Sequence, residues 1–187
     1  MHYCTIVPTT LTMMNKEKFR KAFTSRFRMG LYLFWKLPAA WFMGIRVASF
    51  DDEQCTIRLP YGWRSQNPFR STYFAAQCAA GEMSTGLPAL AAIQGGPPVS
   101  MLVLDFHAEF YKKANQVLIF TFSDVQSMEK SIAAALEGTA ATEFKAESVG
   151  KLPDGTVASR VWVTWSFRLK PGFLGPVPQG SVPKIQV

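Results

Sequence analysis

The fold is decided by a long stretch of small and apolar residues: Ser71-Thr72-Tyr73-Phe74-Ala75-Ala76-Gln77-Cys78-Ala79-Ala80-Gly81-Glu82-Met83-Ser84-Thr85-Gly86-Leu87, continuing to Ile93. A helix that is apolar on nearly every side is a buried one, so this stretch predicts a long buried helix over residues 71–93. Glu82 is the only charged residue in it, and no Lys or Arg occurs from Ser71 to Tyr111. A carboxylate in such surroundings is costly unless a partner or a reaction uses it. Glu82 is therefore the first candidate for a catalytic residue.

Strand patterns flank this helix on both sides. Before it, two strands are expected at residues 45–50 and 55–59, joined by the acidic turn Asp51-Asp52-Glu53. Pro88 is expected to end the regular part of the helix, and the turn at 94–98 closes it. Four strands and one short helix (128–136) then follow, with the strands at 99–111, 117–125, 139–149 and 157–168. Since a buried helix needs a surface that wraps it, the pattern predicts an α+β fold with a curved antiparallel sheet, and not an alternating βαβ chain.

A basic amphipathic helix is predicted ahead of this unit, at residues 16–35. Apolar residues recur there at every fourth position: Phe19, Phe23, Phe27, Leu31 and Trp35. Residues 16–36 hold seven Lys and Arg against Glu17 alone, which gives 7 − 1 = +6 of the net charge of +7. The two interpretations of this charge are an anionic partner and a solvated helix face.

The composition fits one folded domain with appendages. The chain has 187 residues, 48% hydrophobic and 13% aromatic, which is ample for a packed core. The expected division is an N-terminal amphipathic helical segment (1–44), a main domain (45–169) and a tail rich in Pro and Gly (170–187).

Cysteine usage and hydropathy predict a cytoplasmic protein. The three cysteines form no CxxC pair, so neither a disulfide framework nor a zinc site is indicated. The first fifteen residues lack the pattern of a secretory signal. The most hydrophobic stretch, residues 29–45, is interrupted by Lys36 and Pro38 and falls short of the ~20 apolar residues of a spanning helix.

The residues around the start of the buried helix resemble a known motif. Asn67 is followed two residues later by Phe69, six residues later by Tyr73-Phe74-Ala75, and fifteen residues later by Glu82. This is similar to hotdog-fold thioesterases of the 4-hydroxybenzoyl-CoA and phenylacetyl-CoA types, in which an Asn or Gln precedes an aromatic or small residue, a His-Gly-Gly and an Asp or Glu at these spacings. The order of elements agrees over about residues 40–169. The resemblance implies a hotdog fold, with a long central helix wrapped by a curved antiparallel sheet, plus an extra N-terminal amphipathic helix.

The chain departs from the family at Tyr73-Phe74-Ala75, where those enzymes have His-Gly-Gly. The change removes a histidine that orients the thioester and adds bulk where the backbone approaches the acyl carbonyl. The chain therefore resembles a divergent branch of the superfamily.

The resemblance implies a role for each residue in the hydrolysis of an acyl-CoA or acyl-carrier thioester. Glu82 would be the base or the nucleophile, Asn67 would hold the water or the carboxylate, and Tyr73 would stand at the histidine position. The backbone N–H of Phe74 or Ala75 would bind the oxyanion, since a helix start offers unpaired donors. No cofactor or metal is expected, and coenzyme A enters only as part of the substrate.

Helix geometry adds a requirement for two chains. Tyr73 and Glu82 are nine residues apart, so at ~100° per residue they point to opposite sides of one helix. Hotdog dimers resolve this by combining the helix start of one chain with the acid of the other. A homodimer, or a dimer of dimers, is therefore expected.

Several alternatives stay open. Glu82 could pair with Arg64 or Arg70, and the protein could bind an acyl-CoA or lipid without turnover, with residues 16–45 on a membrane surface. The phenylalanine stripe is nevertheless expected to pack on the sheet or on the dimer partner. Asp105, His107 and Glu109 share one strand face, which a metal could use but which more often marks a polar face. A hotdog hydratase and a nucleic-acid-binding protein are less well supported, because their loop and reading motifs are missing.

Overall fold

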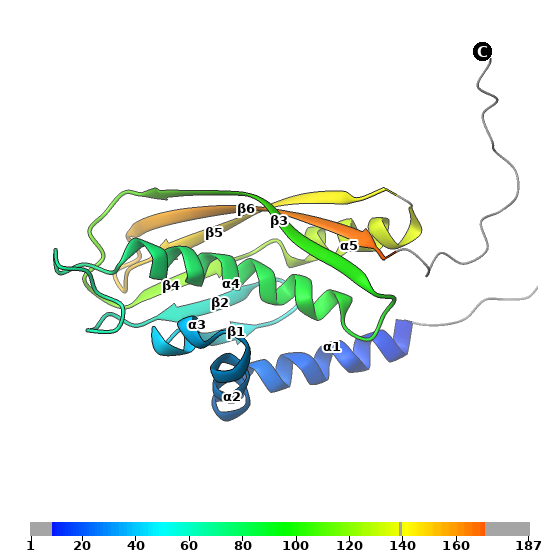
Figure 1. The fold of residues 1–187 in the computed structure, drawn as a ribbon, viewed down its shortest axis with the longest axis horizontal. Coiled ribbons are helices and arrows are strands. Elements are labelled where there is room, and N and C mark those ends of the chain that lie inside the picture. The colour runs from blue at the N-terminus through cyan, green and yellow to red at the C-terminus, as the bar shows by residue number, and fades with distance from the viewer. Residues whose placement is uncertain (1–8, 139, 171–187) are drawn as a thin grey trace, which may run out of the picture.

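The protein is an α+β fold in which one antiparallel sheet wraps a long helix (Figure 1). The computed structural model describes residues 9–138 and 140–170, with side chains described from residue 17 onward. The helices are α1 (Thr9–Thr24), α2 (Arg26–Lys36), α3 (Pro38–Phe42), α4 (Phe74–Ile93) and α5 (Val125–Glu137). The strands are β1 (Arg46–Phe50), β2 (Cys55–Leu59), β3 (Val99–Phe110), β4 (Leu118–Phe122), β5 (Thr142–Lys151) and β6 (Val157–Leu169).

The sheet has the order β1-β2-β4-β5-β6-β3, and all its strand pairs are antiparallel. The alternation predicted for the last strand is confirmed. Val161, Val163, Trp165 and Phe167 of β6 are buried, whereas Trp162, Thr164 and Ser166 between them are only partly buried. Residues directly opposite on neighbouring strands share a face. Phe106 of β3, opposite Val163, therefore lies on the same face of the sheet, but it is 40% exposed because β3 is at the edge.

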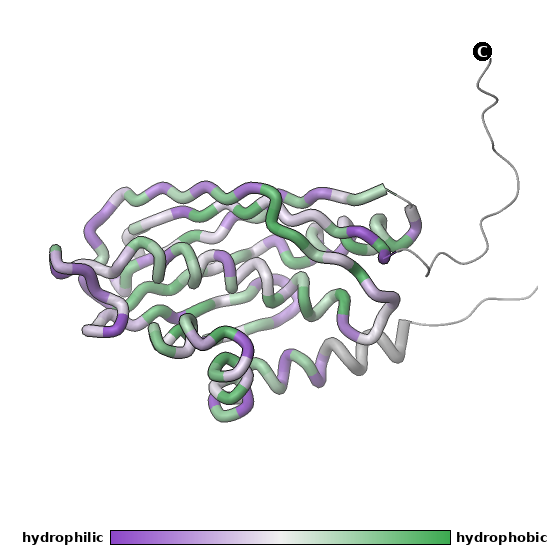
Figure 2. The backbone as a smooth tube through the Cα atoms, in the orientation of Figure 1, coloured by the Kyte–Doolittle hydropathy of each residue, from purple (hydrophilic) through white to green (hydrophobic). Residues whose placement is uncertain are grey.

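Helix α4 lies against the buried face of the sheet and is coloured mainly green and white in Figure 2. It packs on β2, β4, β5 and β6, and a Cβ placed at Gly81 would meet Val161 of β6 at 2.7 Å. Its buried hydroxyls find partners on the sheet: Ser84 Oγ donates to Ser148 Oγ (2.6 Å), and Trp165 Nε1 donates to Thr85 Oγ1 (3.0 Å). The helix continues through Pro88, contrary to expectation, because most helical stability comes from tertiary packing.

The expected single helix at 16–35 is two helices. Ser25 has extended backbone angles (φ −71°, ψ 116°), so the chain turns between α1 and α2. Phe19 and Phe23 stack at 4.0 Å on α1, which an ion pair of Arg20 with Asp52 (2.6 Å) ties to the turn after β1. None of the helices in the described part of the chain is long and apolar enough to cross a membrane.

The change of direction at Ser25 changes which side chains are buried. Helix α2 buries Met29 and Leu33, so the later part of the phenylalanine stripe faces water. Phe27 is 81% exposed and Trp35 is 73% exposed. Within one chain the second half of the stripe therefore does not pack on the sheet, and its packing on a dimer partner stays a prediction.

The other elements lie close to their predicted positions. In the turn between β1 and β2, Asp51 Oδ1 accepts hydrogen bonds from the N–H groups of Glu53 and Gln54. Helix α5 is longer than expected at both ends, and β5 begins at Thr142 instead of residue 139. Residues 171–187, which make up nearly all of the predicted tail, lie outside the described residues, and the domain division stays a prediction.

Candidate functional site

Glu82 is a half-buried carboxylate on α4. A Cβ placed at Gly86, one turn further on, would lie 3.1 Å from Glu82 Oε1 and 3.3 Å from the Trp165 ring. Glycine at this position therefore gives the carboxylate room to lie against the helix, beside an indole.

The Glu82 carboxylate lacks a stabilising partner within the described residues. It forms no ion pair or hydrogen bond there, and in particular it does not pair with Arg64 or Arg70. Burial raises the pKa of Glu82 above its ordinary value, because the ionised form is poorly solvated. A carboxylate with a raised pKa and no assigned structural task is the type of group that acts as a general base or nucleophile.

The start of α4 presents free hydrogen-bond donors. Tyr73 is the N-cap residue, and its own N–H donates to the Ser65 carbonyl (2.7 Å). Its carbonyl accepts from the N–H groups of Ala76 and Gln77. The N–H groups of Phe74 and Ala75 have no acceptor in the described part of the chain. These two donors stand at the positive end of the helix dipole, where an oxyanion would be stabilised.

Asn67 organises the loop ahead of the helix. Its Oδ1 accepts hydrogen bonds from the N–H of Phe69 (3.0 Å), the N–H of Ser71 (3.2 Å) and the Ser71 hydroxyl (3.1 Å). The amide oxygen is thus occupied in holding the loop, and only Nδ2 is left to contact a water or a carboxylate. Phe69 is 79% exposed.

A pocket of about 340 Å³ lies where this loop, the start of α4 and the end of β3 meet. Asn67, Thr72, Phe74 and Gln77 line it together with Phe110. Sequence reasoning missed Gln77: its Oε1, like Thr72 Oγ1, is buried without a hydrogen-bond partner among the described residues. A buried polar atom without a partner costs about 1–3 kcal/mol. In the sequence, the signal that could have identified Gln77 is an amide side chain within a helix of mostly small and apolar residues.

One chain brings together only part of the predicted site. Asn67 and Phe74 share the pocket, but Glu82 and Tyr73 do not line it. Glu82 lies eight residues after Phe74, which is about 12 Å along the helix axis. The spacing in the sequence predicts that Tyr73 and Glu82 lie on opposite faces of one helix, but Tyr73 is an N-cap residue with an extended backbone and lies outside the helix. The distance along the helix axis is what separates the Glu82 carboxylate from the start of α4.

The strand face of Asp105, His107 and Glu109 forms no metal site. His107 Nε2 lies 3.3 Å from Glu109 Oε1, and its ring packs 5.3 Å from that of Trp162. No three His, Cys, Asp or Glu side chains within the described ranges are placed to hold a metal ion.

Comparison with known proteins supports the fold. No protein-family model matches the chain, and no curated protein matches it. Among solved structures, a probable thioesterase from Pseudomonas aeruginosa is similar at a TM-score of 0.60 and 16% identity, over 79% of this chain and 98% of that one. A putative thioesterase from Shewanella oneidensis gives a TM-score of 0.61 at 11% identity, over 81% and 99%.

A third similar protein is a thioesterase from Staphylococcus aureus, at a TM-score of 0.53 and 15% identity, over 67% of this chain and 94% of that one. It was solved as a glutamine-to-alanine variant and as a glutamate-to-alanine variant, at positions fifteen residues apart. The chain therefore has the hotdog fold, at low sequence identity to these thioesterases.

Proposed function

We propose that the protein hydrolyses acyl thioesters of coenzyme A or of an acyl carrier, as a homodimer, with Glu82 as the base or nucleophile. The observation that carries this proposal is the half-buried Glu82 carboxylate, which has a raised pKa and no partner among the described residues. A group kept in this state costs stability, so its retention is better explained by a reaction than by folding.

The proposed reaction uses few groups. Glu82 removes a proton from a water molecule whose oxygen attacks the thioester carbon, and the N–H groups of Phe74 and Ala75 stabilise the oxyanion that forms. Asn67 Nδ2 holds the water. When the tetrahedral intermediate collapses, the C–S bond breaks and the leaving thiolate takes the proton from Glu82.

Two features of the chain support the proposed dimer. First, Phe74 and Glu82 of one chain are separated by about 12 Å, too far to act on one carbonyl. Second, β3 is a twelve-residue strand of which one edge pairs with no described strand, and it exposes apolar side chains such as Leu102 (60%) and Leu104 (49%). An unpaired edge of this length pairs readily with another chain. Antiparallel pairing of two β3 edges relates the chains by a two-fold axis, which sets one α4 antiparallel to the other.

The spacing of the polar residues also supports the proposal. Asn67 and Glu82 are fifteen residues apart. The amide and acid replaced in the Staphylococcus aureus thioesterase have the same separation.

The second candidate function is acyl-CoA or lipid binding without turnover. Tyr73-Phe74-Ala75 replaces the His-Gly-Gly of related thioesterases, and the Phe74 side chain, which is 56% exposed, lines the pocket beside its own N–H. This side chain stands where a glycine would let a thioester approach.

The Glu82→Gln variant separates these two functions. A base or nucleophile is needed mainly in the transition state, so kcat for a panel of acyl-CoAs should fall by about 10²–10⁴-fold while ligand affinity barely changes. Glu143→Gln, an exposed carboxylate on β5, is the matched control and should retain full activity. Wild-type rates in Glu82→Gln would refute the mechanism, and binding without hydrolysis in both proteins would establish the second function.

The dimeric site is tested by removing one donor. Phe74→Pro deletes a single N–H at the first helical position, which tolerates proline, and Tyr73 (φ −59°, ψ 133°) already has the extended backbone preferred before proline. Its rate should fall by about 10²–10³-fold relative to Phe74→Ala, which keeps the N–H. Mixing Glu82→Gln with Phe74→Pro should restore about a quarter of the wild-type activity, since half the dimers are mixed and hold one intact site. No recovery on mixing would place the whole site within one chain.

A further inference from the structure

Helix α2 is apolar on two opposite sides, and only one of them is buried. The buried side carries Met29 and Leu33. On the other side, exposed apolar residues recur at the i, i+4, i+7 and i+8 spacing of a single helix face. They are Phe27 (81% exposed), Leu31 (52%), Phe34 (47%) and Trp35 (73%).

The exposed face continues onto α3. Trp41, 43% exposed, packs edge-on against Phe34 with ring centroids 5.1 Å apart. Phe34 also packs edge-on against Trp35 at 5.5 Å. We call these five residues, Phe27, Leu31, Phe34, Trp35 and Trp41, the aromatic surface. Large exposed apolar surfaces rimmed by polar groups mark sites of interaction with a partner or a membrane.

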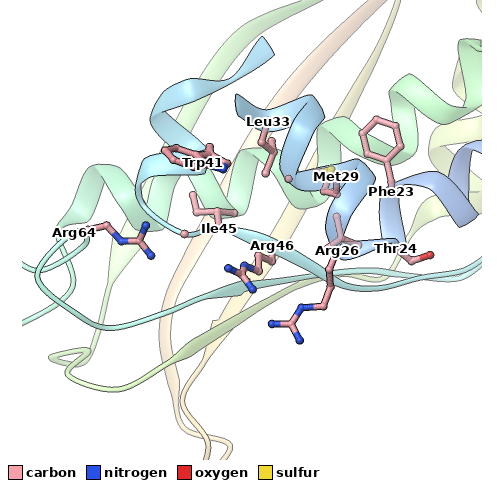
Figure 3. Close-up of a pocket in the computed structure, with 12 residues that line it drawn as sticks. Phe23, Thr24, Arg26, Met29, Leu33, Trp41, Ile45, Arg46 and Arg64 are labelled. Carbon is pink, nitrogen blue, oxygen red and sulfur yellow. The ribbon is translucent and has the colours of Figure 1, made fainter. Parts of the chain in front are cut away.

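Cationic side chains adjoin the aromatic surface. On α2 itself the exposed cations are Arg26, Arg28 and Lys36, whereas Arg46 and Arg64 line a cavity of about 170 Å³ on the buried side of this helix, beside Met29 and Leu33 (Figure 3). None of the three α2 cations forms an ion pair with a described residue. In addition, no Asp or Glu occurs between Lys18 and Phe50, a stretch with seven Lys and Arg. The charge of this region is thus complementary to an anionic surface.

The aromatic surface lies away from the edge proposed for dimerisation. Helices α1 and α2 contact β1, which is at one end of the sheet, and β3 is at the other end (Figure 1). A second copy that pairs with β3 therefore joins the sheet at the edge opposite to β1, the strand that α2 contacts.

We propose that the aromatic surface and the three α2 cations dock the protein on an anionic lipid bilayer, a property beyond thioester hydrolysis. Phe27, Leu31 and Trp35 enter the boundary between headgroups and acyl chains, where aromatic residues are preferred. Arg26, Arg28 and Lys36 bind the lipid phosphates. A nucleic acid would bind the cations but would leave the apolar side chains in water, so it explains only half of the surface.

Cosedimentation of the full chain with vesicles tests the proposal. The wild type should bind vesicles of phosphatidylcholine with phosphatidylglycerol, bind pure phosphatidylcholine weakly, and release as salt is raised. Each basic residue near such a surface contributes about fivefold to binding, so Arg26→Gln with Arg28→Gln and Lys36→Gln should weaken it by about 100-fold. The matched control removes three exposed cations elsewhere, Lys130→Gln, Lys145→Gln and Lys151→Gln, and should change it only slightly.

A second variant probes the apolar part. Phe27→Ser with Trp35→Ser should abolish most vesicle binding and the blue shift of tryptophan fluorescence that insertion produces. Three results would overturn the proposal: no vesicle binding by the wild type, equal binding to neutral and anionic vesicles, or equal loss in the lysine control. Salt-sensitive binding to duplex DNA that persists in Phe27→Ser with Trp35→Ser, without vesicle binding, would assign the α2 cations to a nucleic acid instead.

Discussion

Helices α4 and α2 break the usual rule of helix patterning in opposite ways. Helix α4 is buried nearly all round, yet it keeps a carboxylate, Glu82, among apolar groups. Helix α2 is buried on one side only, yet its outer side carries Phe27 and Trp35 instead of polar residues. A globular helix normally shows one apolar stripe and one polar face. In each helix the residues that packing does not explain are those that we assign to a function.

The physical cost differs between the two helices. In α4 the cost is electrostatic, because the ionised form of Glu82 is poorly solvated. In α2 it is hydrophobic, because Phe27, Leu31 and Trp35 remain in contact with water. Substitutions therefore distinguish the helices by the sign and size of their effect on stability.

The largest contrast is expected between the two sides of α2. Leu33→Ala should lower the free energy of unfolding by about 2–5 kcal/mol, because Leu33 is 2% exposed and its removal leaves a cavity. Leu31→Ala, two residues away and 52% exposed, should change it by less than about 0.5 kcal/mol. Urea denaturation of both variants measures the difference. Similar losses would mean that the outer side of α2 is covered in solution, for example by a second copy.

An intermediate contrast is expected between two mid-helix glycines. In α4, Gly81→Ala places a Cβ 2.7 Å from Val161 Cγ2, and such overpacking costs about 1–3 kcal/mol. In α2, a Cβ at Gly30 meets nothing within 4 Å, so Gly30→Ala should stabilise the protein by about 0.5–1 kcal/mol through helix propensity. Thermal denaturation of both variants reports the two signs. Stabilisation by both substitutions would show that α4 is not held this close to β6.

Most of the fold could be predicted because local patterns and burial agree. The alternation of β6 and the apolar run of α4 each predict an element and its buried face. The break at Ser25 could not be predicted, because the i+4 pattern of apolar residues continues across it. The separate packing of Phe19 and Phe23 on α1 is a tertiary feature that this local pattern does not encode. The passage of α4 through Pro88 was missed for a similar reason, because packing outweighs local preference there.

The candidate site was less predictable than the fold. Glu82 stood out because a charge in an apolar run is visible in the sequence. The task of Asn67 Oδ1 in holding the loop, and the unpaired Oε1 of Gln77, depend on how the loop at 65–72 folds against α4. The distance from Glu82 to the helix start likewise needed the true position of the N-cap, Tyr73.

The smallest expected effect is that of Glu82→Gln on stability, and its sign is decisive. Burial raises the pKa of Glu82, so the folded protein binds this proton more tightly than the unfolded chain does. The contribution of Glu82 to stability is therefore fully present below its unfolded pKa, and it is lost as the pH rises through the raised folded pKa. Glutamine cannot ionise, so the variant should match the wild type at acidic pH and exceed it modestly at neutral pH. Urea denaturation at several values between about pH 4 and pH 8 measures this.

The opposite result, a less stable variant at neutral pH, would mean that the ionised Glu82 has a stabilising partner, and the comparison of α4 with α2 would lose its basis. The matched control is Glu143→Gln on β5, where the exposed carboxylate should give no such pH-dependent difference. The same raised pKa governs the proposed reaction, because only the ionised carboxylate can accept a proton from water. The rate of thioester hydrolysis by the wild type should therefore rise as the pH passes through the raised pKa of Glu82. This is the same pH interval in which the contribution of Glu82 to the stability of the folded protein is lost. Coincidence of the two pH profiles would identify one carboxylate as the source of both the catalytic activity and the stability cost.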